Sequence, residues 1–478
     1  MNRLSKYLNI IVFICVFAIF LAGITLRIAT AEGMSYWLAF LTALLCVAAV
    51  LFFAGKIKLR ERFIKRNYKW QVCLAVLAGV CFAVKLIWVL VFRIKPTVDY
   101  STFYDTALAF AGDGPFNVLY LSLFPHIMGY SWFLSGFFRI FGSGFLVAPV
   151  VNVVLSVFSG MMIFRLLRSN AGLYEACTGF ALWIICPSGT LYNTMTLSEP
   201  YYTCLIFAVL CILDYMCSIV DGSIIAGIFC GCLSGVLLAL INAARPIGAV
   251  FIIAFFIWYL LLRGKKSFTK MNIKVFFPYA VFMLAVYLLA GSAWSAKINN
   301  ILGTEVSSFP GYSVYTGFDT ETYGTYDGSA MQLLTDIAVS EGSEAAQQKM
   351  LEMAKENILS GNINFAKLLK NKLIAFLGND EGGAYYSIEW LKPWQYSFLT
   401  FISNIFYYAL VIVLAIKVII RIKGLKTINV QNEGGIIEYA SLSALGIIIA
   451  QMLVEVAGRY HYALIPIIIM LVCSFRRV

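Results

Sequence analysis

Apolar residues along this chain gather into long runs that short polar loops separate. Twelve runs come close to the roughly 20 residues that an α-helix needs to cross the hydrocarbon core of a bilayer. The runs cover residues 8–29, 36–54, 70–92, 145–164, 173–190, 199–218, 223–241, 246–263, 275–293, 396–420, 435–455 and 462–475. The pattern predicts an all-α, polytopic membrane protein with about twelve transmembrane helices.

A further apolar segment, residues 124–142, is predicted to lie beside the membrane rather than to cross it. If this segment spanned, Arg165 and Arg168 would lie on the opposite side from the densest basic block, residues 56–69. The proline, the histidine and the short length of the segment favour a juxtamembrane helix. Every basic block then lies on one side, which the positive-inside rule assigns to the cytoplasm together with both termini.

The predicted spans divide the chain into four parts. We expect residues 1–69 to add two membrane helices and a basic cytoplasmic loop, residues 70–293 to form a transmembrane core, residues 294–395 to form an extracytoplasmic module, and residues 396–478 to supply the last helices. The first outer loop of the core is residues 93–144.

The extracytoplasmic module contains two kinds of sequence. Residues 303–330 are rich in Gly, Tyr and Thr, which is typical of turns. Residues 331–378 repeat apolar side chains at a helical period, which predicts two or three amphipathic helices against the membrane surface.

Composition supports the membrane class and excludes others. Of the 478 residues, 61% are hydrophobic and 13% charged, and the mean hydropathy is +0.85. The net charge of +12 comes from short basic blocks between apolar runs, so it orients the protein in the bilayer and does not indicate a nucleic-acid partner. All 12 cysteines lie in predicted spans, which argues against a disulfide framework. No phosphate-binding loop, GxGxxG, HExxH or DxD motif is present, so no cofactor is predicted and no metal site is indicated.

Ionisable residues at predicted helix ends on the outer side are candidates for a site. Glu199, Arg245 and Arg459 lie near the depth of the interface, where an ionisable group is costly unless it is paired or solvated. Because no nucleotide-binding signature is present, an enzyme here needs a donor that is already activated. A lipid-linked phosphosugar supplies both an activated sugar and a tail that fits between helices.

The first outer loop places carboxylates among aromatic residues in "PTVDYSTFYDTALAFAGDG", residues 96–114. Asp99 is the candidate general base that takes a proton from the acceptor hydroxyl, and Asp105 is its rival. Arginines bind phosphate oxygens in a bidentate fork. The candidate donor-phosphate residues are Arg245, Arg459 and His461, and the candidate substrate-binding residues are Tyr100, Tyr104, Glu199 and Tyr460.

Several motifs resemble one superfamily in the same order along the chain. These motifs are residues 96–114 with "FPHIMGYSWFLSGFFRIFGSG", "TLSEPYYTCL", "INAARPIG", "GYSVYTGFDTETYGTYD" and "GRYHYALIP". They are similar to the GT-C membrane glycosyltransferases, which include protein O-mannosyltransferases and lipid A aminoarabinose transferases. The resemblance implies an inverting transfer from a polyprenyl-phosphate sugar to a glycan, lipid or protein of the cell envelope, with Asp99 as base by position. Many members carry an Asp-Glu pair there, whereas Tyr100 follows Asp99 in this chain. This difference weakens the case for a metal ion held by adjacent carboxylates.

Two other functions fit a multi-spanning protein. A flippase or transporter of lipid-linked sugars needs charged residues deep in the bundle, whereas the polar residues here concentrate at one face. An O-antigen ligase or polymerase takes diphosphate-linked donors and usually has more outer-face arginines. Single residues also have structural alternatives: Asp99 and Glu199 can stabilise helix starts, and Lys85 can extend its amine to the interface.

Overall fold

The computed structural model describes residues 2–31, 34–218, 223–264, 269–307, 309–423 and 435–474. Over these ranges the protein is helical and has no strand. Eight helices are long and apolar enough to cross a membrane: α1 (Asn2–Thr30), α2 (Ser35–Lys56), α4 (Trp70–Val91), α8 (Val147–Asn170), α11 (Glu199–Ser218), α12 (Ile224–Ala244), α14 (Lys270–Leu302) and α20 (Pro393–Lys423). The predicted all-α polytopic class is confirmed.

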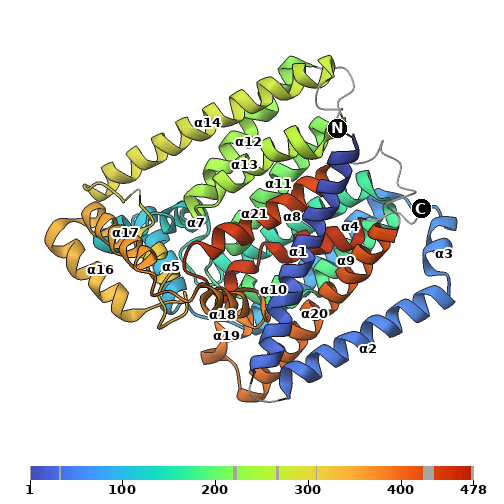
Figure 1. Cartoon of the computed structure of the whole chain (residues 1–478), viewed down its shortest axis with the longest axis horizontal. Helices are drawn as coiled ribbons and strands as arrows, with labels where there is room; N and C mark the ends of the chain where they lie inside the picture. The colour runs from blue at the N-terminus through green and yellow to red at the C-terminus, as the bar shows by residue number, and fades with distance from the viewer. Residues whose placement is uncertain are drawn as a thin grey trace.

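Four shorter apolar helices occupy the remaining predicted spans. They are α9 (Leu173–Ile185), α13 (Gly248–Ile257) with η2 (Trp258–Leu262), α21 (Ile436–Met452), and α22 (Leu464–Cys473) preceded by η7 (Gly458–His461). Each of the twelve apolar runs therefore contains one helix or one such pair. Figure 1 shows the long helices running side by side through the molecule.

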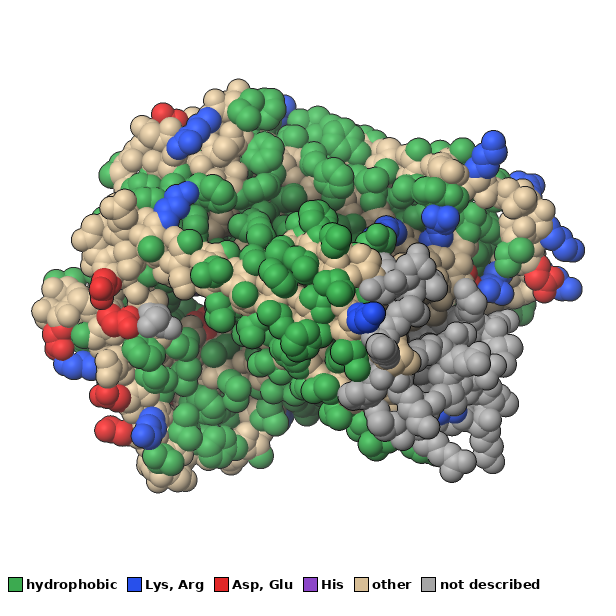
Figure 2. All heavy atoms as spheres, turned by 90° about the horizontal axis from the view of Figure 1, so that it is seen from above, with side chains coloured by type: hydrophobic (Ala, Val, Ile, Leu, Met, Phe, Trp, Pro, Cys, Tyr) green, Lys and Arg blue, Asp and Glu red, His purple; other side chains and the backbone are tan. Residues whose placement is uncertain are grey.

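Short helices gather at one end of the bundle, which we call the cavity end. They are α5 (Val98–Ala111), α6 (Val118–Leu123), α7 (Ile127–Phe141), α15 (Gly311–Gly317), α16 (Gly328–Glu341), α17 (Ser343–Leu359), α18 (Phe365–Leu377) and α19 (Gly382–Tyr385). The opposite end carries α3 (Leu59–Lys65), and we call it the basic end. Figure 2 shows apolar side chains over the middle of one face and charged side chains at both ends, as expected for helices surrounded by lipid.

The segment predicted to lie beside the membrane forms α7, which packs along α5. The Ser131 hydroxyl donates to the Phe103 carbonyl at 2.9 Å, and the Phe103 and Tyr130 rings meet edge to face. The helix is absent from the span candidates among the described residues. It therefore forms part of the cavity end.

The expectation that residues 303–330 form only turns was partly wrong, because α15 lies within them. The reason is tertiary packing: α15 lies against α17, and Tyr312 and Thr316 are buried. At Gly311 a Cβ atom would lie 1.7 Å from the Gln347 carbonyl oxygen, so only glycine permits this approach.

The N-terminal helix is integral to the bundle. It packs against α18, α20 and α21, and Phe13, Val16, Phe20 and Ile24 on it are at most 1% exposed. At its cavity end the Arg27 guanidinium donates to the Glu381 carboxylate at 3.1 Å. The N-terminal part thus contacts the loop that leads into α19.

Helices α12 and α14 pack closely along one half of their length and leave a groove between them along the other half. A Cβ atom at Gly231 would lie 2.6 Å from the Tyr279 carbonyl oxygen, and Gly227 and Gly235 on the same row are about as close to α14. Small residues at such spacing let membrane helices approach closely. Toward the cavity end the row continues with Ala239 and Ala243, and both residues line a groove between the two helices.

Candidate functional site

A small cavity lies at the cavity end, where loops and helix ends from distant parts of the chain meet. Its volume is about 140 Å³, and we call it the charged cavity. Its charged lining residues are Glu199, Arg245, Glu455 and Arg459. Its aromatic lining residues are Phe103, Tyr120, Phe124, Tyr312, Tyr326 and Tyr460. The structure thus brings together four of the predicted site residues: Glu199, Arg245, Arg459 and Tyr460.

The two arginines share one aromatic ring. The Arg245 guanidinium carbon lies 3.6 Å from the centre of the Tyr460 ring, and that of Arg459 lies 5.5 Å from it. Arg245 directly follows the end of α12, and Arg459 lies in η7. Stacking engages the face of a guanidinium and leaves its N–H edge oriented for bidentate binding of an oxyanion. This geometry suits a phosphate group.

Glu199 is a buried carboxylate at the first residue of α11. It is 2% exposed, and its Oε1 atom lies 3.8 Å from the Arg459 Nε atom, which is an ion pair too long for a hydrogen bond. Its Oε2 atom has no hydrogen-bond partner among the described residues. A buried carboxylate that is incompletely hydrogen-bonded costs free energy. The atom is therefore placed to accept a hydrogen bond from a bound hydroxyl group.

His126, immediately before α7, also lines the charged cavity. Burial, reinforced by the nearby Arg245 and Arg459 cations, lowers the pKa of His126 to about 3. The imidazole is therefore neutral near pH 7, so it can both donate and accept a hydrogen bond. Sequence reasoning noted this histidine on the outer side but did not assign it to the site.

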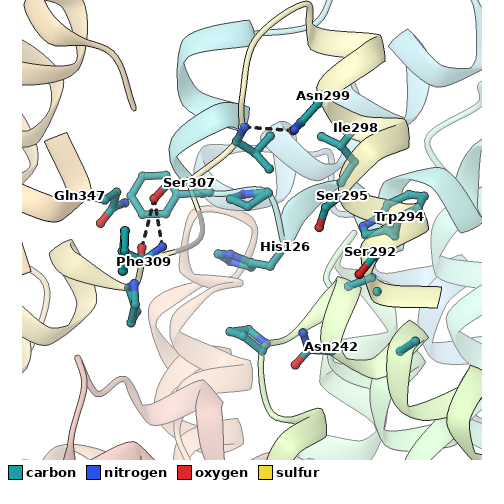
Figure 3. A pocket seen from close by; sticks show the side chains of 18 of the residues that line it. His126, Asn242, Ser292, Trp294, Ser295, Ile298, Asn299, Ser307, Phe309 and Gln347 are labelled. Carbon is teal, nitrogen blue, oxygen red and sulfur yellow. Dashed lines mark hydrogen bonds between the residues drawn. The ribbon is translucent and has the colours of Figure 1, made fainter. Parts of the chain in front are cut away.

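A larger groove adjoins the charged cavity. Its volume is about 700 Å³, and it lies between α12, α14 and residues that follow α14, among them Val306 and Ser307 (Figure 3). Phe124, His126 and Ser313 line both spaces. Figure 3 shows His126 pointing into the groove between Asn242 on one side and Ser307 on the other. The groove and the charged cavity therefore adjoin at Phe124, His126 and Ser313.

The lining of the groove differs from that of the cavity. Among the described residues, no Asp, Glu, Lys or Arg side chain lines the groove, and its one histidine, His126, is neutral. The other lining residues are apolar residues, tyrosine, tryptophan, serine, asparagine and glutamine. The Asn299 side chain accepts from the Val306 N–H at 3.0 Å, which holds the loop over the groove. An uncharged space between two membrane helices suits a lipid chain better than an ion.

The two acidic residues predicted as bases have different positions. Asp99 is in the first turn of α5, three residues before Thr102, which lines the cavity; its side chain lies outside the described part of the structure. Asp105 is exposed and does not line the charged cavity, and partial burial raises its pKa. The structure therefore does not bring the rival base into the cavity.

Tyr100 and Tyr104 were expected to hold a sugar ring, but the structure places both elsewhere. The Tyr100 hydroxyl donates to the Tyr386 carbonyl at 2.7 Å, and the Tyr104 hydroxyl donates to the Ser143 carbonyl. Residues four apart share a helix face, and on α5 that face packs on neighbouring loops. Thr102 and Phe103 line the charged cavity instead.

His461 does not line the charged cavity, which corrects its grouping with the donor-phosphate arginines. It is 2% exposed; its Nδ1 lies 2.8 Å from the Phe376 carbonyl and its Nε2 lies 3.1 Å from an Asp380 oxygen. The Phe376 carbonyl and the Asp380 carboxylate thus hold the ring from both sides. The Ser188 hydroxyl also donates to Asp380, at 2.6 Å.

A second buried charge, that of Lys372, holds the chain just before Arg459, whereas Asp380 holds it just after. The Lys372 amine is 1% exposed as a residue and donates to the carbonyls of Gly317, Met452 and Val454 at 2.9, 2.9 and 2.6 Å. Close by, the Glu455 N–H donates to the Ser313 carbonyl at 2.7 Å. Residues 372–380 thus clamp the segment that carries Arg459 and Tyr460, with Lys372 before it and Asp380 after it.

Lys85 was expected to extend toward the interface, and this was wrong. The residue is buried within α4, and its amine donates to the Gly189 carbonyl. The reason is that the short helix α10 (Ser188–Leu191) lies inside the bundle, and the Gly189 carbonyl on it accepts from side chains. Among the described residues, no group of three or more His, Cys, Asp or Glu side chains is placed to hold a metal ion.

Comparisons with known proteins give one structural likeness to report. No protein-family model matches the chain, and no curated protein matches it. The crystal structure of ArnT from Cupriavidus metallidurans bound to undecaprenyl phosphate is similar over 83% of this chain and 77% of that chain, at 12% sequence identity and a TM-score of 0.38. At this identity and TM-score the likeness assigns no chemistry to individual residues.

Proposed function

We propose that this protein is a membrane glycosyltransferase that transfers a sugar from a polyprenyl-phosphate donor to an acceptor at the cavity end, on the outer face of the cytoplasmic membrane. The observation that carries the proposal is that two adjoining spaces share lining residues. One space holds two arginines and a buried carboxylate, and the other is an uncharged groove between membrane helices. A lipid-linked sugar phosphate has a group for each space.

The donor phosphate binds at Arg245 and Arg459 in this proposal. Their stacking on Tyr460 fixes two positive charges 3.6 and 5.5 Å from one ring. When the sugar leaves, negative charge grows on the phosphate, and fixed cations in a cavity with little water stabilise that charge. The arginines therefore favour the departure of polyprenyl phosphate.

The groove between α12 and α14 takes the first part of the polyprenyl chain. Ala239 and Ala243 leave space on α12, and Leu288 and Ile298 of α14 supply apolar walls. The groove meets the charged cavity at His126. A donor that enters sideways from the bilayer can thus place its phosphate at the arginines without removing its tail from apolar surroundings.

The sugar occupies the charged cavity beneath the aromatic residues. The unpartnered Oε2 atom of Glu199 accepts from a sugar hydroxyl, and the neutral His126 ring donates or accepts a further hydrogen bond. Tyrosine rings such as Tyr312 and Tyr326 present flat apolar faces to the C–H groups of the sugar.

Asp99 is the proposed general base. In the step, the acceptor oxygen attacks the anomeric carbon, the bond from that carbon to the phosphate oxygen breaks, and the acceptor proton goes to the carboxylate. Inversion follows because attack and departure take place on opposite sides of the carbon. Support for this assignment comes from the position of Asp99 one helical turn before Thr102 and Phe103, which line the cavity.

The direct test is to follow the fate of the donor. Purified protein in lipid nanodiscs is given a polyprenyl-phosphate sugar with a labelled sugar and an extract of envelope acceptors. We expect free polyprenyl phosphate and labelled acceptor in equal amounts. Movement of intact donor across a vesicle membrane, without release of polyprenyl phosphate, would instead identify a flippase. Mass spectrometry of envelope glycans with and without the protein identifies the acceptor.

A further inference from the structure

The basic end contains a second candidate binding site, which is independent of the chemistry at the cavity end. Residues 56–70 link α2 to α4 through α3, and we call them the basic hairpin. The hairpin contains seven Lys or Arg residues and one acid, Glu61. Figure 1 shows α3 at the edge of the molecule, beyond the end of α2.

The hairpin has a defined shape. Lys58 and Asn67, which flank α3, both have φ of 47°, a left-handed conformation that is unfavourable for residues other than glycine. One side of α3 is docked: the Arg60 Nε atom lies 2.8 Å from the Glu175 carboxylate, and the Phe63 ring packs 5.6 Å from that of Tyr174. Docking fixes α3 against the start of α9 and leaves its other cations exposed.

A cavity of about 700 Å³ opens between the hairpin and the end of α8. Lys69 and Arg168 line it together with Tyr68 and Trp70, and no acidic side chain lines it. The Arg168 guanidinium lies 4.0 Å from the Trp70 ring centre. A guanidinium held flat on tryptophan presents its N–H edge to an anion. The cavity thus offers two cations beside a phenol and an indole.

An exposed apolar row runs along α4, the helix that begins at this cavity. Val72, Val76 and Val80 follow each other at intervals of four residues and are 57%, 57% and 45% exposed. Residues at this spacing lie on one face of a helix. Because α4 is long and apolar enough to cross a membrane, this face lies against acyl chains. The cationic cavity therefore sits at headgroup depth, at the end of a helix whose exposed face contacts acyl chains.

We propose that the cavity between the basic hairpin and α8 binds the headgroup of an anionic diacyl phospholipid from the leaflet at the basic end. The phosphate lies between Lys69 and Arg168, and an acyl chain follows the valine row of α4. Tryptophan and tyrosine are enriched at headgroup depth, and basic pockets between membrane helices bind anionic headgroups. Lipid rather than free phosphate is the occupant because the cavity lies at the end of a membrane-spanning helix, where the acyl chains of a bound lipid remain in the hydrocarbon.

The test compares two lipids that differ only in headgroup. Protein purified in neutral detergent is titrated with phosphatidylglycerol or phosphatidylcholine of the same acyl chains, and bound lipid is counted by native mass spectrometry. Wild-type protein should retain phosphatidylglycerol preferentially. The Lys69→Gln/Arg168→Gln pair should bind it about 30-fold more weakly, because each basic residue near the headgroup contributes about fivefold.

The matched control removes two positive charges from the cavity end. Lys355 and Lys370 are exposed on α17 and α18, and the Lys355→Gln/Lys370→Gln pair should bind phosphatidylglycerol like wild type. Equal loss in both pairs, or equal retention of the two lipids by wild type, would overturn the proposal. The same holds if inorganic phosphate alone displaces the bound lipid at millimolar concentration.

A measurement on unmodified protein covers the case in which the double variant does not fold. The preference for phosphatidylglycerol should fall as salt rises toward about 1 M, where the screening length is only about 3 Å. A preference that persists unchanged at high salt would show that headgroup charge is not what the site recognises.

Discussion

The two ends of this bundle use positive charge in opposite ways. At the cavity end, Arg245 and Arg459 converge on one tyrosine beside a carboxylate that is 2% exposed. At the basic end, the cations of the hairpin spread over an exposed surface, and Arg60 alone among them makes a close contact with a buried carboxylate in the described structure. Charges that are fixed and shielded from water act strongly on a bound group, whereas exposed charges act weakly and are screened by salt. The comparison predicts large effects of mutation at one end and small effects at the other.

The largest effect is expected at Asp99. Asp99→Asn keeps the shape and the hydrogen-bonding capacity of the side chain but removes the proton acceptor. Loss of general-base catalysis typically lowers the rate by about 100- to 10,000-fold. Turnover of a labelled polyprenyl-phosphate sugar measures this, and donor binding should be retained.

Asp105→Asn is the matched control, because Asp105 is on the same helix but is exposed and outside the charged cavity. We expect near wild-type turnover from this variant. If Asp105→Asn is inactive while Asp99→Asn turns over normally, the base has been placed at the wrong residue of α5.

The next effect concerns the phosphate cations. Arg245→Ala and Arg459→Ala should each remove a charge-assisted contact worth about 1.5–3 kcal/mol, which is roughly 10- to 150-fold in kcat/KM. Lysine at either position should restore only part of this, since it lacks the planar fork and stacks less well. Arg62→Ala, in the basic hairpin, is the control from the other end and should leave kcat/KM unchanged.

A smaller and pH-dependent effect is expected at Lys372, which positions the segment of Arg459 and Tyr460. Burial lowers the pKa of Lys372 to about 8, although Glu455 opposes the shift. Below pH 8 the ammonium has three N–H groups for its three carbonyl acceptors, and above pH 8 it has two. We therefore expect kcat/KM to fall as the pH rises through 8, and Lys372→Met to lack this limb and to have a higher donor KM throughout.

Stability should change with the opposite sign, which separates positioning from unfolding. The pKa of Lys372 is lower in the folded chain than in the unfolded chain, so the unfolded chain binds more protons between about pH 8 and 10.5. The contribution of this group to the free energy of unfolding therefore rises over that window. Thermal unfolding of wild type and Lys372→Met across this range checks the sign. A wild-type pH limb that Lys372→Met retains would show that another group titrates.

Contacts between distant parts of the chain, such as those of Lys372, mark the limit of what the sequence predicts. The membrane helices follow from apolar runs because length and hydropathy are local properties. The sequence indicated three residues of the charged cavity, because a charge at a helix end near lipid is costly unless it is paired or solvated. The structure brings these residues, Glu199, Arg245 and Arg459, together. Their roles remain predictions. By contrast, the Asp380–His461 contact joins residues 81 positions apart, and nothing in either local sequence indicates the partner.

The sequence also does not predict how α5 is rotated about its own axis. Alternating acidic and aromatic residues in the first outer loop indicate a site, but they do not show which face of α5 turns toward it. The helix begins at Val98, with Thr97 as its N-cap, so Asp99 lies within the first turn and is not the cap. Its cavity face carries Thr102 and Phe103, while Tyr100 and Tyr104 contact loops. Only the packing of α5 on α7 decides between these faces.

The smallest effect is expected at Tyr100, and it sharpens the same point. Tyr100→Phe removes the hydroxyl that donates to the Tyr386 carbonyl and keeps the buried ring, which is 3% exposed. The same hydroxyl accepts from the Thr97 hydroxyl at 3.0 Å, so the loss of two neutral hydrogen bonds should lower the free energy of unfolding by about 1–3 kcal/mol. If the residue only supports the loop before α20, donor KM and kcat should both stay within about twofold of wild type, and thermal unfolding alone should shift. Phe103→Ala is the comparison variant, because it removes a ring that lines the charged cavity and should raise the donor KM severalfold. A larger rise in KM for Tyr100→Phe than for Phe103→Ala would mean that the sugar contacts the other face of α5, and the cavity assigned to it here would be the wrong one.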